Sequence, residues 1–341
     1  MRDLHTLPKA HLHVHLESTI RPHTLTDLAQ RHHITIPSVP PEGYPGFRAF
    51  ADRGTLVRSC LRHPEDFTRI TSEYLADAAA DGIRYAELTL SSGSHTERLG
   101  ADVLPAVIAA LEANQHDITA RLILDHSRRR PTTRLATMID TALRHPDTVV
   151  AIGVAGDEAH PIAPFATLLA DARAAGLRMV HHAGEMTGPH SIAEALTLGA
   201  ADRIGHATTT DTPTLHLLRE HGAAVEVCAS SNLALRSITH LDQHPLPRLI
   251  DAGIPLSINL DIPDVLGTTL TAEYTRLRDH YHWDDHTIAA IATTAIDSSF
   301  APDDVKARVR ADLTAWITET SATTGTTGCD TSHQTPRRWS T

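Results

Sequence analysis

The chain has 341 residues, a formal net charge of −11, 41% hydrophobic residues and 4% aromatic residues. The negative charge disfavours a general attraction to nucleic acid or anionic membranes, and no run reaches the roughly 18 apolar residues that a membrane span needs. Three scattered cysteines, Cys60, Cys228 and Cys329, exclude a disulfide framework and a Cys-x-x-Cys zinc site. Since the N-terminus shows no apolar signal stretch, we expect a cytoplasmic protein that acts on a small molecule.

Short apolar runs alternate with longer amphipathic stretches along most of the chain. The runs predict eight β-strands, at residues 10–16, 83–90, 118–124, 149–154, 178–182, 201–205, 224–228 and 255–260. Helical patterns separate them, at residues 67–81, 101–115, 133–144, 164–175, 191–198, 212–220 and 246–251, and several end at a glycine. This repeated strand–helix alternation favours a closed (β/α)₈ barrel, a TIM barrel, over an open sheet.

We expect residues 1–319 to form a single catalytic barrel domain. Residues 36–54 are rich in Pro and Gly, which predicts loops and short helices capping the mouth within a lid segment at 32–66. Residues 320–341 are mostly Ser, Thr and Gly, so they predict a disordered tail. Arg128, Arg129, Arg130 and Arg134 follow the third strand, where a solvated loop is the favoured interpretation and phosphate binding the alternative.

Histidine is abundant, with 25 in the chain, so each cluster has to be weighed against chance. His11, His13 and His15 alternate through the first strand, and in a strand all three should point to one face. Two imidazoles at positions i and i+2 can chelate one divalent ion. A polar lining of the barrel is the alternative interpretation.

Further ionisable side chains close other predicted strands. His182 with Glu185 closes the fifth strand, His206 the sixth and Asp261 the eighth. The active site of a (β/α)₈ barrel lies at these strand ends, and unpartnered buried ionisable groups are costly, so the set predicts a site for Zn²⁺ or a similar ion. Taken singly, His206 fits a core histidine and Glu185 a surface carboxylate. His181 should point to the opposite face from His182.

The motifs resemble those of the adenosine deaminase family, a branch of the amidohydrolase superfamily. The resemblance covers about residues 5–310, with the motifs in the family's order. They are PKAHLHVHLE at 8–17, AGDE at 155–158, HAGE at 182–185, RIGH at 203–206, CASSN at 228–232, HPLPRL at 244–249 and NLDIP at 259–263.

The resemblance implies one Zn²⁺ per chain and no other cofactor. The implied ligands are His13, His15, His182 and Asp261, which leave one position for water. It implies that His206 orients this water and accepts its proton, with Asp261 as a second acceptor. A protonated Glu185 donates to the ring nitrogen beside the attacked carbon, and ammonia leaves.

The chain departs from the family pattern around the substrate. Ile262 stands where the family has an aspartate that hydrogen-bonds purine N7, and an unpaired buried N7 costs about 1–3 kcal/mol. An apolar side chain suits a C–H or methyl group, as in a 7-deazapurine, or a smaller heterocycle; the alternative is that another residue supplies the contact. Glu17 replaces an aspartate that contacts the ribose 5′-hydroxyl, whereas Gly156, expected to offer its N–H to a ring nitrogen, is kept.

We therefore expect a zinc-dependent hydrolytic deaminase that acts on an aminopurine nucleoside or related nitrogen heterocycle, with specificity altered from adenosine. One alternative is a metal-dependent hydrolase of another C–N bond, in an amidine or cyclic amide, from which ammonia release distinguishes it. The other is a non-catalytic nucleoside-binding protein, against which the retained Glu185 and His206 argue. We expect neither nucleic acid nor membrane as a partner.

Overall fold

The computed structural model describes residues 1–319, so the tail expected at 320–341 lies outside the described residues. An eight-stranded sheet carries the strands in the order in which they follow along the chain. The strands lie close to the predicted runs: β1 (Lys9–His15), β2 (Ile83–Leu90), β3 (Thr119–Ser127), β4 (Val149–Ala155), β5 (Arg178–Ala183), β6 (Arg203–His206), β7 (Ala224–Val227) and β8 (Leu256–Ile258).

All neighbouring strands pair in parallel, and the sheet closes on itself between β1 and the residues that follow β8. Val14 forms a parallel bridge with Asp261. The Asp261 N–H donates to the His13 carbonyl at 2.9 Å, and the His15 N–H donates to the Asp261 carbonyl at 3.0 Å. The predicted (β/α)₈ barrel is therefore confirmed.

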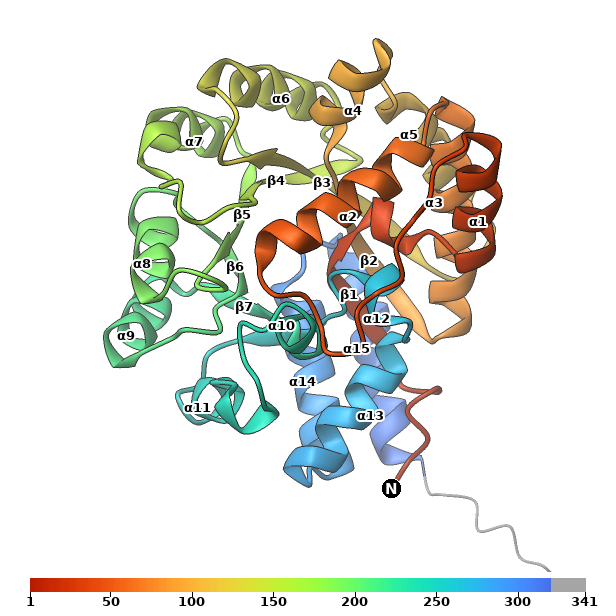
Figure 1. Ribbon diagram of the computed structural model, residues 1–341. Coiled ribbons are helices and arrows are strands. Elements are labelled where there is room, and N and C mark those ends of the chain that lie inside the picture. The colour runs from red at the N-terminus through yellow and green to blue at the C-terminus, as the bar shows by residue number, and fades with distance from the viewer. Residues whose placement is uncertain (320–341) are drawn as a thin grey trace, which may run out of the picture.

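Helices surround the strands (Figure 1). They are α1 (Pro22–Arg31), α2 (Phe47–Cys60), α3 (Pro64–Ala80), α4 (Ser92–Leu99), α5 (Leu104–Glu112), α6 (Thr132–Arg144), α7 (Ala166–Ala174), α8 (Pro189–Thr197), α9 (Thr212–His221), α10 (Ala229–Ala234), α11 (Leu246–Asp251), α12 (Pro263–Leu266), α13 (Leu270–Tyr281), α14 (Asp285–Ser298) and α15 (Asp303–Thr318). Each of the predicted helical patterns overlaps one of them. No helix within residues 1–319 combines the length and the apolar character needed to cross a bilayer.

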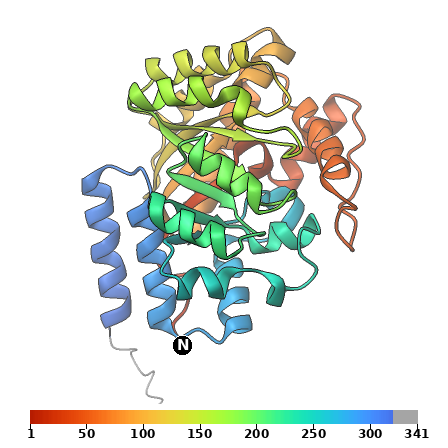
Figure 2. The same ribbon diagram turned by 90° about the vertical axis from the view of Figure 1, so that its left-hand side faces the viewer.

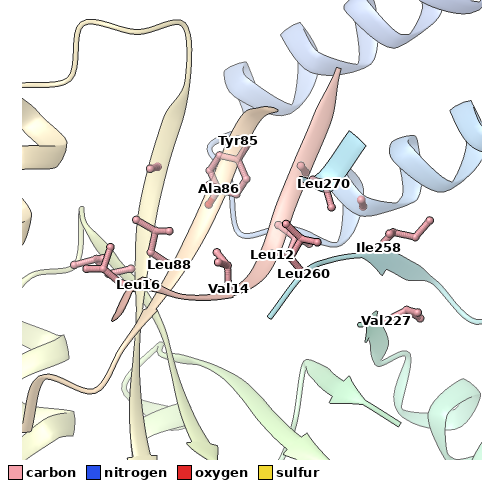
Figure 3. Packing of buried hydrophobic residues seen from close by; sticks show 14 of the residues in the cluster. Leu12, Val14, Leu16, Tyr85, Ala86, Leu88, Val227, Ile258, Leu260 and Leu270 are labelled. Carbon is pink, nitrogen blue, oxygen red and sulfur yellow. The ribbon is translucent and has the colours of Figure 1, made fainter. Parts of the chain in front are cut away.

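Alternation along β1 explains how the barrel offers polar groups to its interior without losing its core. Leu12 and Val14 are fully buried in the main apolar cluster, together with Leu88 of β2 (Figure 3). Because successive side chains of a strand point to opposite faces, these leucine and valine positions leave His13 and His15 for the barrel interior.

The segment between α1 and α3 carries a 14-residue helix, α2, which is longer than the short helices expected there. This helix lies across the barrel in Figure 1, and Figure 2 shows its orange segment at the end of the molecule opposite α15. An apolar cluster packs the segment against the loops after β7 and β8. Its members are Tyr44, Leu235, Ile262 and Val265, with Phe47 and Phe50 packed against them.

Candidate active site

A cavity of about 570 Å³ opens at the carboxyl ends of the strands, beneath α2. Most of the site residues predicted from the sequence line it: His15, Glu17, Gly156, His182, Glu185, Asp261 and Ile262. His13 and His206 are almost completely buried at 2% and 1% exposure, and the contacts below place them beside the lining residues. The barrel thus brings together residues from five of its strands or the loops that follow them.

Three imidazoles and one carboxylate converge at the base of this cavity. One possible ligand atom from each of His13, His182, His206 and Asp261 lies within 4.8 Å of all the others. His15 adjoins the group, since its Nε2 lies 3.2 Å from Asp261 Oδ1 and 3.2 Å from His182 Nε2. The side chains predicted to bind a metal are therefore neighbours in space, and this donor set can hold a metal ion.

Two residues of this group have unusual backbone angles. His206 ends β6 with φ 69°, and Asp261 follows β8 with φ 66°. Left-handed backbone is uncommon for residues other than glycine, and such strained positions gather at functional sites. These angles occur where the chain leaves β6 and β8, so they determine how the side chains of His206 and Asp261 enter the mouth of the barrel.

His13 is oriented by a buried ionic network that the sequence did not predict. Its Nδ1 lies 2.6 Å from Glu226 Oε2 of β7, and Arg203 donates from Nε to the other Glu226 oxygen at 2.6 Å. Arg203 also pairs with Glu87 and lies 4.0 Å above the ring of Phe300. The only sequence signal was a charged residue within the short apolar run of β7.

The remaining nitrogen of His13, Nε2, is buried and has no hydrogen-bond partner among the described residues. A carboxylate that binds the far nitrogen of an imidazole is the usual support of a metal-binding histidine, because it fixes the ring and its tautomer. The orphaned Nε2, facing Asp261 at 3.5 Å, therefore fits a ligand to a divalent metal ion.

The electrostatics of the cluster favour positive charge at its centre. Burial opposes a charge on His13, but the Asp261 and Glu226 carboxylates beside the ring outweigh burial and raise its pKa to about 10. Burial lowers the pKa of His206 to about 4 and that of His182 well below its usual value. A metal ion binds neutral imidazoles, so His182 already has the binding form, whereas a metal ion at His13 would displace the proton of that ring.

Glu185 lies next to the cluster with its Oε2 3.7 Å from His206 Nε2. Burial, together with the negative charges of Asp261 and Glu158, raises the pKa of the Glu185 carboxyl well above its usual range. The Glu158 carboxylate accepts the N–H groups of Gly184 and Glu185, at 2.9 and 2.8 Å. Glu158, a residue to which the sequence assigned no role, thus holds the turn that carries Glu185.

The expectation that three alternating histidines share one face is wrong for His11. Its Nδ1 lies 3.0 Å from the Tyr74 hydroxyl of α3, and its Nε2 accepts the Leu260 N–H at 3.2 Å. The pairing of β1 with β2 shifts between His11 and Val14, which breaks the regular alternation.

His181, in contrast, faces away from His182 as expected. Its Nδ1 accepts the Val154 N–H at 3.1 Å, and its Nε2 lies 3.0 Å from the Gly199 carbonyl oxygen. Both ring nitrogens are thus used within the fold, which leaves His182 as the one histidine of this pair at the site.

Arg128 is a second correction. It is buried, not solvated, and donates from Nη2 to the His182 carbonyl at 2.6 Å and from Nη1 to the His160 carbonyl at 3.2 Å. Arg129 and Arg130 are exposed as expected. Arg128 therefore stabilises the end of β5, because the backbone carbonyl oxygens there need hydrogen-bond donors.

Polar and apolar residues divide the remaining wall of the cavity. Burial opposes a charge on Glu17, but His95, whose Nε2 lies 2.6 Å from Glu17 Oε1, lowers the pKa of this carboxyl to about 2. Gly156 has φ 90°, which favours glycine at this point of the wall. Ile262 is 2% exposed and contributes only carbon atoms.

Comparison with known proteins agrees with this geometry. Residues 8–316 match the family model described as adenosine deaminase. An aminodeoxyfutalosine deaminase of Streptomyces avermitilis is 35% identical, and the match covers 93% of this chain and 95% of that protein.

Two solved structures share the fold closely. The adenine deaminase of Arthrobacter aurescens superposes with a TM-score of 0.84 at 29% identity, over 91% of this chain and 99% of that one. An amidohydrolase of Burkholderia ambifaria with bound Zn has a TM-score of 0.80 at 27% identity, over 92% and 90% of the two chains. The chain belongs to the adenosine deaminase family of the amidohydrolase superfamily, and it is a deaminase, a hydrolase of C–N bonds other than peptide bonds.

Proposed function

We propose that the protein is a zinc-dependent hydrolytic deaminase, with residues 1–319 as one catalytic domain and residues 32–66 as its lid. It replaces an exocyclic amino group of an aminopurine nucleoside or related nitrogen heterocycle by oxygen and releases ammonia, with specificity altered from adenosine. The observation that carries the proposal is the convergence of His13, His182, His206 and Asp261 beside Glu185, a carboxyl whose pKa is raised by burial.

The residues that would hold one Zn²⁺ per chain are His13, His15, His182 and Asp261. The bound zinc of the Burkholderia ambifaria relative supports this choice of metal. We assign His15 and not His206 as the fourth ligand because His206 Nε2 faces the Glu185 carboxyl, whereas His15 Nε2 lies between Asp261 and His182. When bound, Zn²⁺ lowers the pKa of water so that hydroxide is available at neutral pH.

The protein's own residues would move the protons. His206, uncharged because burial lowers its pKa, accepts a proton from the attacking water, and the Asn232 amide 3.2 Å from its Nδ1 fixes the ring. Asp261, whose Oδ2 accepts a hydrogen bond from Ser231 at 2.6 Å, is the second acceptor. As the water oxygen adds to the attacked carbon, Glu185 donates its proton to the adjacent ring nitrogen and the carbon becomes tetrahedral. The proton that His206 took from the water then passes to the amino group, the remaining hydroxyl proton goes to Asp261, and the C–N bond breaks with release of ammonia.

The walls of the cavity would bind the remainder of the substrate. The charged Glu17 would accept a hydrogen bond from a hydroxyl group of a sugar-like substituent, and the Gly156 N–H would donate a hydrogen bond to a ring nitrogen. Ile262 would contact the ring edge that carries N7 in a purine, where it offers no hydrogen bond. A heterocycle with a C–H or methyl group at that position fits this wall better than adenosine does.

The substrate class is tested by ammonia release from adenosine, adenine, adenosine monophosphate, 7-deazaadenosine and aminopyrimidines. We expect 7-deazaadenosine to be deaminated with a higher kcat/KM than adenosine, because its C7–H needs no donor. No ammonia from any heterocyclic amine in the panel would contradict the proposed function.

The Ile262→Asp variant is expected to raise kcat/KM for adenosine relative to 7-deazaadenosine by about ten-fold or more, since a carboxyl at this position pairs with N7. The ratio of kcat/KM for the two substrates is the measurement, because a general loss of stability affects both equally. Ile262→Val, which keeps an apolar wall, serves as the control and should leave the ratio unchanged. An unchanged ratio in Ile262→Asp means that another residue sets the specificity.

Glu226→Gln is expected to weaken zinc binding by about 10–100-fold, because the amide orients His13 less strongly than a carboxylate does. The affinity is measured by competition with a chromophoric chelator on protein whose circular dichroism matches that of the wild type. Glu112→Gln, an exposed position on α5, is the matched control. Equal zinc affinity in the two variants would remove Glu226 from the support of His13.

A further inference from the structure

A buried arginine on the lid helix faces the same cavity and takes no part in the deamination chemistry. Arg53 of α2 is 8% exposed and lines the cavity. Its Nη1 donates to Asp264 Oδ2 at 2.5 Å, and its Nε donates to the Pro37 carbonyl at 3.3 Å. The third nitrogen, Nη2, has no hydrogen-bond partner among residues 1–319.

Arg53 shares a wall of the cavity with Ile262. Asp264, its partner, lies two residues after Ile262 in α12 and also lines the cavity. Phe50, one helical turn before Arg53, packs against the apolar cluster that contains Ile262. The wall therefore combines an apolar contact, Ile262, with a guanidinium held at its edge.

The anchoring of Arg53 explains why its free nitrogen can select a ligand. A buried guanidinium is costly without an opposite charge, and the Asp264 side chain, 5% exposed, supplies that charge. Two fixed nitrogens restrict the planar group, so the N–H donors of Nη2 point in a set direction without further loss of side-chain freedom. A ligand that covers Nη2 but offers no acceptor there removes these donors from water and leaves them without a partner.

We propose that Arg53 is a specificity-determining residue that donates from Nη2 to a hydrogen-bond acceptor on the substrate, next to the ring edge in contact with Ile262. The substrate class is a 7-deazapurine-type amino heterocycle that carries a carbonyl, carboxamide or nitrile group on its C7. This inference rests on the proposed function, in which Ile262 contacts that edge of the ring.

Three analogues of 7-deazaadenosine test it: the 7-cyano and 7-carboxamide compounds carry an acceptor, and the 7-methyl compound is the apolar control. In the wild type, we expect kcat/KM from ammonia release to be about ten-fold or more higher for the first two than for the third. Arg53→Met should reduce this advantage to less than about three-fold, mainly through KM. Arg48→Met, an exposed arginine on the same helix, should preserve it.

Two further measurements keep the test decisive. The double variant Arg53→Met with Asp264→Leu removes the unpaired carboxylate that the single variant leaves buried, so it covers a failure of Arg53→Met to fold. Calorimetric binding of the corresponding 7-cyano and 7-methyl deamination products measures the same preference without turnover. If the wild type releases ammonia but the 7-cyano and 7-methyl compounds have equal rates, and their products equal affinities, the role of Arg53 alone is overturned. If no ammonia is released, the proposed function is overturned.

Discussion

Glu185→Gln is expected to lower kcat by about two to four orders of magnitude and to leave the zinc content unchanged. Glutamine keeps the size and polarity of the side chain but has no acidic proton that it could transfer to the ring nitrogen. The Glu158 carboxylate binds the backbone N–H groups of residues 184 and 185, not the Glu185 side chain, so the turn should persist in the variant. Steady-state ammonia release and elemental analysis on the same preparation measure both quantities.

The matched control for this experiment is Glu220→Gln, an exposed position on α9 that should retain full activity. A strongly lowered kcat in Glu185→Gln, with unchanged substrate binding, would indicate that the general acid has been lost. Retention of most of the wild-type kcat would mean that Glu185 is not the acid, and that its raised pKa only reflects its burial next to Asp261 and Glu158.

Removal of zinc by a chelator is expected to abolish ammonia release, and about one equivalent of Zn²⁺ per chain should restore it. The physical reason is that without zinc no hydroxide would be available at neutral pH. The buried carboxylates of Asp261 and Glu226 favour the return of a cation to the imidazoles. Elemental analysis before and after dialysis gives the stoichiometry. Full activity in protein that is shown to be free of metal would exclude the proposed chemistry.

Two variants separate the possible ligand sets. His15→Ala should lose most of its zinc, whereas His206→Ala should retain zinc and lose turnover, because His206 is assigned to the water and not to the metal. His116→Ala, an exposed histidine, is the control for the effect of losing an imidazole. The reverse outcome would identify His13, His182, His206 and Asp261, whose ligand atoms lie within 4.8 Å of one another, as the ligand set.

Much of the barrel could be predicted because its signals are local. The apolar runs around Ile83–Leu90 and Val149–Ala155 reflect strands covered on both faces, and the intervening helical patterns follow from their 3.6-residue period. The convergence of His182, His206 and Asp261 could be inferred as well. Parallel strands of a barrel all end at the same mouth, so residues at their carboxyl ends become neighbours whatever their separation in sequence.

His11 and Arg128 were misinterpreted because their positions depend on features of the folded chain that do not show in the alternation of side chains along a strand. His11 follows the same spacing as His13, but a shift in strand pairing turns it toward Tyr74. Arg128 sits in a run of exposed arginines, and only the folded chain brings the carbonyl oxygens of His160 and His182 within its reach.

The amino-acid sequence by itself determined the order of strands and helices, the chemistry of the mouth and the apolar character of position 262. The periodicity of side chains and the types of metal-ligating residue are properties of short segments, so they can be recognised in the sequence alone. Only the tertiary structure decided which groups support that chemistry, through Glu226 beside His13, Glu158 beneath Glu185, and Arg53 joined to Asp264 across 211 residues. Such pairs form when the barrel closes and α2 packs on it, because burial then requires a partner for every charge, and no local pattern specifies which residue that partner is.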